Sequence, residues 1–139
     1  KVVIDKMNLL LQTTSSCVSP FIQKAGIEAI SGDQKKIKQM IKEYQKRRDV
    51  LVDGLNSISN IECLKPGGAF YVFANIKKTG KSSEEIARFL LKDANIAVLP
   101  GTNFGKYGEG YIRLCYATSL KNINLGIQQI SKSMRKINE

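Results

Sequence analysis

The stretch VLPGTNFGKYGEGYIRLCYATS at residues 98–119 decides the fold of this chain. It holds a short apolar segment ended by Pro100-Gly101, a glycine-rich loop that runs to Gly110, and the strand-like run YIRLCYA. Glycines in such a loop allow unusual backbone angles or a close approach between two backbones. The stretch therefore predicts two short strands joined by a structured loop.

Arg113 stands in the middle of the second predicted strand. Side chains alternate across a strand, so Tyr111, Arg113 and Cys115 are predicted to share one face. An arginine keeps its charge in a protein, and a carboxylate fits its planar fork best. From the residues alone three interpretations stay open: a ligand carboxylate, a salt bridge to a glutamate, or exposure on an edge strand.

Helical and strand-like patterns alternate outward from this stretch. Apolar residues spaced by three and four predict helices, and short runs rich in aromatic or β-branched residues predict strands. Clustered hydroxyls at residues 13–17 predict a loop. The predicted helices cover residues 2–12, 20–30, 33–58, 82–93 and 119–137, and the predicted strands cover residues 69–74, 96–98 and 111–117. This order predicts an α/β (α+β) fold with a short sheet packed with helices.

Composition narrows the possible functions. The chain has 139 residues, a formal net charge of +10, three cysteines and no histidine. The cysteines are far apart and form no C-x-x-C pair, which argues against a disulfide framework or a metal site and favours a cytoplasmic protein. No apolar run is long enough to span a membrane. We expect no metal and no membrane partner.

Two other functions compete. The basic charge allows a stand-alone α/β module that binds nucleic acid, but the long helix lacks interleaved aromatics and any nucleic-acid motif. The run NIKKTGKS at residues 75–82 has asparagine where a phosphate-binding loop needs its first glycine. A solvated loop with Ser82 and Glu85 as a capping box is the simpler interpretation of that run.

Four segments in order carry a resemblance to a known family. They are TTSSCVSPFIQKAGIEAI at 13–30, EYQKRRDVLVDGLNSI at 43–58, KPGGAFYVF at 65–73, and the stretch at 98–119. Together they resemble the C-terminal part of class I (fold-type I) pyridoxal-phosphate-dependent aminotransferases, especially aspartate aminotransferases. The resemblance covers nearly all of the chain.

The resemblance implies a domain organisation and a set of site residues. Residues 1–32 would be the helical end of the large cofactor-binding domain, 33–60 a long interdomain helix, and 61–139 the small C-terminal α/β domain. Arg113 matches the arginine that pairs with the substrate α-carboxylate, and Phe70 and Tyr71 match a strand that borders the active site. Ser15 and Ser16 match hydroxyls near the cofactor phosphate, at an interface between subunits of a homodimer.

The resemblance also implies the reaction. The intact enzyme would transfer an amino group between an amino acid, aspartate or a related one, and a 2-oxo acid through pyridoxal 5'-phosphate. The family's Schiff-base lysine lies in a Ser-Lys segment that has no counterpart here. We therefore assign no catalytic residue to this chain, and expect it to be inactive alone.

Overall fold

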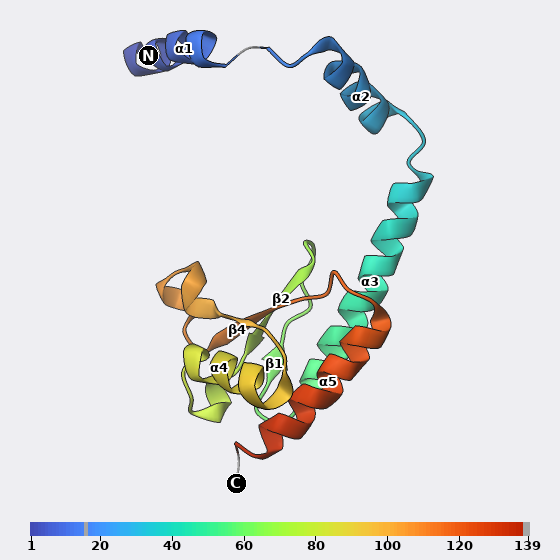
Figure 1. Cartoon of the computed structure of the whole chain (residues 1–139), viewed down its shortest axis with the longest axis vertical. Coiled ribbons are helices and arrows are strands. Elements are labelled where there is room, and N and C mark those ends of the chain that lie inside the picture. The colour runs from blue at the N-terminus through green and yellow to red at the C-terminus, as the bar shows by residue number, and fades with distance from the viewer. Residues whose placement is uncertain (16, 138–139) are drawn as a thin grey trace. The chain divides into compact units, whose positions relative to one another are not determined.

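The computed structural model describes residues 1–15 and 17–137 (Figure 1). The chain divides into two compact units, Lys1–Lys36 and Ile37–Glu139.

The first unit consists of α1 (Val2–Thr14) and α2 (Pro20–Ser31). The prediction of a loop from residue 13 is wrong for the two threonines: α1 continues through both, and the hydroxyls of Thr13 and Thr14 each donate to the Leu10 carbonyl at 2.8 Å. Ser19 precedes α2 at the capping position and Pro20 opens the helix, as predicted. Neither helix has a buried residue, so this unit has no apolar core of its own.

The second unit is a sheet with helices packed against it. Its strands follow the order β1-β2-β4-β3, and every neighbouring pair is antiparallel. The strands are β1 (Glu62–Cys63), β2 (Tyr71–Asn75), β3 (Leu99–Pro100) and β4 (Tyr111–Cys115), and the helices are α3 (Lys35–Asn56), α4 (Ser83–Ala94) and α5 (Leu120–Arg135). Short 3-10 turns η1 (Lys77–Thr79), η2 (Gly101–Phe104) and η3 (Lys106–Gly108) complete the loops.

One face of this sheet carries the core. Strand residues Val72, Ala74, Ile112 and Leu114 are buried in one cluster with apolar side chains from all three helices, among them Leu55, Ile86, Leu90, Ile123 and Ile130. Figure 1 shows α5 running alongside α3, where Gly54 faces the Ile127 side chain so closely that a Cβ at Gly54 would collide with it. The opposite face carries Tyr71, Phe73, Tyr111, Arg113 and Cys115, which are half-buried or exposed. The predicted mixed fold with a short sheet is confirmed.

Helix starts in this unit follow the predicted caps. Ser82 and Glu85 form a reciprocal capping box at the start of α4, and the Ser119 hydroxyl accepts the Asn122 N–H at 3.2 Å. Asp33, predicted as the cap of the long helix, lies two residues before the start of α3, and its carboxylate accepts the Lys35 N–H at 2.9 Å. Capping depends on side chains within three residues, so the sequence predicts it well.

One predicted strand is misplaced, and one strand was not predicted. Residues 96–98 are not a strand; the residues that pair with β4 are Leu99 and Pro100. The two-residue strand β1 had no signal in the sequence. Both strands lie at the edges of the sheet, and each pairs with its neighbour over only two residues. So short a segment has too few side chains for an alternating pattern to predict it.

Candidate functional site

Arg113 lies in an interior strand of the sheet. β4 pairs with β2 on one side and with β3 on the other, and Arg113 stands opposite Phe73 and Leu99. Tyr111 and Cys115 share its face, as predicted from strand alternation, while Ile112 and Leu114 point into the core. The interpretation of Arg113 as an edge-strand residue is therefore excluded.

Aromatic rings flank the Arg113 guanidinium. Its Cζ lies 4.2 Å from the centroid of the Tyr71 ring and 4.4 Å from the centroid of the Phe104 ring. Phe104 in turn meets Phe73 edge-on, with ring centroids 5.5 Å apart. A guanidinium over an aromatic ring is attracted by the negative charge of the ring face. The positive charge is thus held by π systems rather than by an acidic side chain.

The N–H donors of Arg113 have no acceptor among the described residues. Within residues 1–15 and 17–137, no carboxylate forms an ion pair with Arg113 and no acceptor takes a hydrogen bond from it. The interpretation as an internal salt bridge to a glutamate fails for this part of the chain. The Arg113 guanidinium is therefore permanently charged and half-buried, and its N–H donors are free within the described residues. Such a group suits a planar anion such as a carboxylate.

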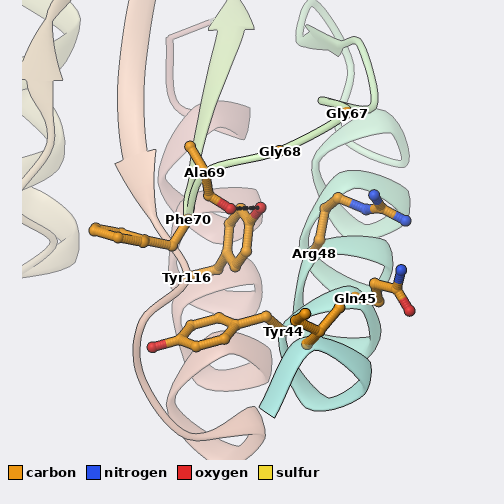
Figure 2. Close-up of a pocket in the computed structure, with 9 residues that line it drawn as sticks. Tyr44, Gln45, Arg48, Gly67, Gly68, Ala69, Phe70 and Tyr116 are labelled. Carbon is orange, nitrogen blue, oxygen red and sulfur yellow. Dashed lines mark hydrogen bonds between the residues drawn. The ribbon is translucent and has the colours of Figure 1, made fainter. Parts of the chain in front are cut away.

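Of the two aromatic residues proposed beside the substrate, Tyr71 lies against this arginine and Phe70 adjoins Tyr71. Their rings are 4.5 Å apart, and Tyr71 contacts the guanidinium directly. Phe70 also lines a pocket of about 230 Å³ (Figure 2), whose other lining residues are Ile41, Tyr44, Gln45, Arg48, Gly67, Gly68, Ala69 and Tyr116. The structure therefore brings Tyr71 to Arg113, while Phe70 lines a separate pocket whose lining residues do not include Arg113.

The pocket in Figure 2 is fixed by internal hydrogen bonds. The Tyr116 hydroxyl donates to the Ala69 carbonyl at 2.8 Å, and the Phe70 carbonyl accepts the Tyr116 N–H at 2.9 Å. Arg48 donates to the Pro66 carbonyl at 3.1 Å and pairs with Asp49 at 2.9 Å. Because its donors have partners, Arg48 serves to hold the segment before β2 in place, unlike Arg113.

The loop that carries Phe104, residues 101–110, is held where its two ends meet; the contacts that hold it are called the clamp. Gly101 and Gly108 lie backbone to backbone, so close that a Cβ on either would collide with the carbonyl of the other. The buried Ser83 hydroxyl accepts the Gly110 N–H at 2.8 Å and the Tyr111 N–H at 3.1 Å. These contacts fix both the loop and the start of β4.

Glu109 completes this clamp. Its carboxylate accepts the Ser83 N–H at 2.8 Å and the Gly110 N–H at 3.0 Å. The Ser83 N–H holds the pKa of the Glu109 carboxyl below its usual value; desolvation opposes this effect, and the Gly110 N–H adds to it. An ionised carboxylate at the first turn of α4 also complements the helix dipole.

Other predicted features lie apart from Arg113 or are structural. Ser15 is exposed in the first unit, and its hydroxyl has no hydrogen-bond partner among the described residues. Ser16 lies outside the described residues. Burial raises the pKa of the Cys63 thiol to about 11. In the described part of the chain no acidic, histidine or cysteine side chains cluster as a metal site would require.

Phe104 is the site residue that the sequence analysis missed. It stands in the glycine-rich loop, for which the sequence predicted only a structured backbone and no contact with Arg113, nine positions later. A signal was available: Phe104 is the apolar residue between Gly101 and Gly105 in an otherwise polar loop. Loops held by a rigid scaffold carry a large share of binding residues.

Comparisons with known proteins identify the family to which the chain belongs. The family model described as aminotransferase class I and II matches residues 1–130. An aspartate aminotransferase of Pyrococcus horikoshii is 42% identical over 95% of this chain, and aromatic-amino-acid aminotransferase 2 of Thermococcus litoralis is 34% identical over 96% of it. The crystal structure of an aromatic aminotransferase from Pyrococcus horikoshii superposes on 98% of the chain with a TM-score of 0.87 and 33% identity.

These proteins are longer than the chain. It spans 34% of the aspartate aminotransferase, 35% of aromatic-amino-acid aminotransferase 2 and 36% of the solved aromatic aminotransferase. In the part of the chain that the structure describes, no helix is both long and apolar enough to cross a bilayer. The family match and these relatives show that the chain belongs to the class I and II aminotransferases, in the part of that family that resembles aspartate aminotransferases.

Proposed function

We propose that the intact protein transfers an amino group between an amino acid and a 2-oxo acid, and that Arg113 binds the α-carboxylate of both. One observation carries the proposal. Arg113 is half-buried in an interior strand and flanked by aromatic rings, yet its donors have no acceptor among residues 1–15 and 17–137. A site that desolvates a fixed charge in this way strengthens its attraction for an incoming anion.

The shape of the guanidinium specifies the ligand. Two parallel N–H groups match the two oxygens of a carboxylate, so the bound group is held in one plane as well as in one place. Every α-amino acid and every 2-oxo acid carries such a carboxylate, so the same arginine serves both halves of the reaction. Aspartate or a related amino acid is the proposed substrate, since the relatives include aspartate and aromatic aminotransferases.

Pyridoxal 5'-phosphate is the proposed cofactor, in keeping with the family. When bound, it supplies an electron sink for chemistry at the substrate α-carbon. The exposed, unpartnered hydroxyl of Ser15 fits a phosphate contact, and Ser16 is proposed for the same role. Phe70 and Tyr71 would form the wall beside the carboxylate and exclude water from it.

The surrounding architecture is part of the same proposal. Residues 1–32 belong to the large domain, 33–60 to an interdomain helix and 61–139 to the small domain, in a cytoplasmic homodimer. The isolated chain is expected not to transaminate. Neither the family match nor the relatives support the alternative of a nucleic-acid-binding module.

Substitution of Arg113 in the full-length enzyme tests the role. Arg113→Ala removes the fork and should weaken binding of both amino acid and 2-oxo acid by about 2–5 kcal/mol, or roughly 30- to 4000-fold. Arg113→Lys keeps the charge without the fork and should restore only part of the affinity. The cofactor absorbance should stay unchanged in both variants.

The matched control is Arg88→Ala. Arg88 is an exposed arginine of α4 that pairs with Glu84, so its loss should leave substrate affinity as it was. If Arg113→Ala also left the affinity for both substrates unchanged, Arg113 would not be the carboxylate-binding residue.

A further inference from the structure

We infer that Phe104 is a positioning residue that fixes the plane in which Arg113 receives a carboxylate. The inference rests on the proposed function of Arg113 and goes beyond it, because it assigns a role to a loop residue that is not itself proposed to touch the substrate. Its structural part can be tested without any enzyme activity.

Phe104 is not a core residue. Its side chain is 48% exposed, and the ring contacts it makes are with Arg113 and Phe73 on the open face of the sheet. Shielding apolar surface in a core is therefore not its main task. A large, half-exposed ring against the Arg113 guanidinium is better explained as a contact that holds the guanidinium in position.

The rings of Tyr71 and Phe104 reach the guanidinium from different sides. Each centroid lies within 4.4 Å of the Arg113 Cζ, yet the ring contacts among the described residues include none between Tyr71 and Phe104. Rings that covered the same side of so small a group would touch each other. The two rings thus flank the guanidinium from different sides, and its N–H donors, which have no acceptor among the described residues, remain available to a ligand.

The ring of Phe104 is placed by contacts remote from Arg113. Phe104 ends η2, which starts at Gly101. Gly101 is pressed against Gly108, and the segment that follows is hydrogen-bonded to Ser83. The loop therefore holds the ring in position before any ligand arrives, so the arginine does not have to lose side-chain freedom on binding.

Without Phe104 one face of the guanidinium would be open to water and free to turn. The α-carboxylate would then be bound less tightly, and its plane would be less well defined. An ordered guanidinium favours the bound substrate and the transition state equally over the free enzyme, because less side-chain freedom is lost on binding. Loss of Phe104 should therefore raise KM with little change in kcat.

The test combines Phe104→Leu with Phe104→Tyr in the full-length enzyme loaded with pyridoxal 5'-phosphate. The leucine removes the ring but keeps apolar bulk; it should raise KM for amino acid and 2-oxo acid by about 2- to 30-fold, the range expected for one cation–π contact. Tyrosine keeps the ring and should restore the KM. Tyr107→Leu is the control, since Tyr107 is a ring in the same loop that lies against Lys106 instead.

A double substitution separates positioning from general damage. If Phe104 acts through Arg113, Phe104→Leu should add nothing to the KM of an Arg113→Ala enzyme. An equal rise in KM in both backgrounds would show that the ring acts independently of Arg113 and would overturn the inference. So would an unchanged KM in Phe104→Leu when Arg113→Ala alone weakens binding, and that result would leave the proposed function standing.

A spectroscopic measurement on the 139-residue chain needs no substrate. Ring currents from two faces should shift the Arg113 side-chain proton resonances upfield, and Phe104→Leu should move them back toward ordinary values while Tyr107→Leu does not. Arg113 resonances at ordinary values in the unsubstituted chain would overturn the inference. If the shifts are present but Arg113→Ala leaves substrate affinity intact, the proposed function fails, and the positioning role fails with it.

Discussion

Arg48 and Arg113 show at the residue scale how the surroundings of one residue type decide its role. Both are partly buried in the second unit. Arg48 donates hydrogen bonds to the Asp49 carboxylate and to the Pro66 carbonyl, so it links α3 to the segment that enters β2. Arg113 is held by ring faces and keeps its donors free within the described part of the chain. The first arrangement stabilises the fold, and the second leaves a charge available to a ligand.

The two arginines should therefore differ in what their loss does to stability. Arg48→Ala leaves the Pro66 carbonyl without this donor and Asp49 with Lys65 as its remaining partner, and should lower the free energy of unfolding by about 1–3 kcal/mol. Arg113→Ala loses ring contacts at a half-exposed site and should cost only about 0.5–1 kcal/mol. Urea unfolding of the 139-residue chain measures both. A larger loss for Arg113→Ala would assign it a structural role.

At the element scale, the start of α4 ties the loop of Phe104 to the body of the unit. The capping box of Ser82 and Glu85 opens the helix, while Ser83 and Glu109 reach across to the residues before β4. Carboxylates and hydroxyls satisfy backbone N–H groups that would otherwise be unpaired at a helix start. The geometry around Arg113 thus depends on this helix start as well as on the strand that carries the arginine.

The Glu109 carboxylate should make this clamp sensitive to acid. Hydrogen bonding from the Ser83 N–H depresses its pKa in the folded chain below the ordinary value of 4.5. A depressed pKa contributes stability above the ordinary value, and that contribution is lost as the pH falls through the folded pKa. Glu109→Gln should therefore reduce the free energy of unfolding more at pH 7 than at pH 3.

Glu84→Gln provides the control for this pH dependence. Glu84 is exposed in the same helical turn and pairs with Arg88, but takes no part in the clamp. Its substitution should change stability less at pH 7 than Glu109→Gln does. A Glu109→Gln effect of the same size at both pH values would contradict the charge-dependent role.

The sequence predicted those elements whose signals are local. The caps at Ser82 and Ser119 depend on side chains three residues apart, and the placement of Arg113 on a shared face depends on simple alternation. Edge strands were misplaced or missed because Leu99 and Pro100 pair only through a partner that lies across a long loop. Phe104 was missed for the same reason: its partners, Phe73 and Arg113, are brought to it by the sheet.

At the scale of the whole molecule, the two units differ in how they are stabilised. The second unit has one continuous core that joins its helices to the sheet. The helices of the first unit have no buried residue and expose many apolar side chains, among them Val2, Val3, Ile4, Leu10, Phe21, Ile27 and Ile30. Helices this short are marginal in water without tertiary packing. The first unit therefore depends on contacts that lie outside its own residues.

Hydrogen exchange on the isolated chain checks this difference. The amides of α1 and α2 should exchange rapidly, while those of α5, which buries Ile123, Ile130 and Met134, should be protected by the global stability of the second unit. A truncated chain that begins at Gln34 should keep the same α5 protection. Protection of α1 equal to that of α5 would contradict the account of the first unit.

The structure of the full-length enzyme with a bound, unreactive substrate analogue tests the role of Arg113 most directly. The account predicts that the α-carboxylate accepts two parallel hydrogen bonds from the Arg113 guanidinium, at about 2.7–2.9 Å, with the rings of Tyr71 and Phe104 still against that group. An analogue whose α-carboxylate is held by other residues, with the Arg113 donors paired to a carboxylate of the protein itself, would contradict it.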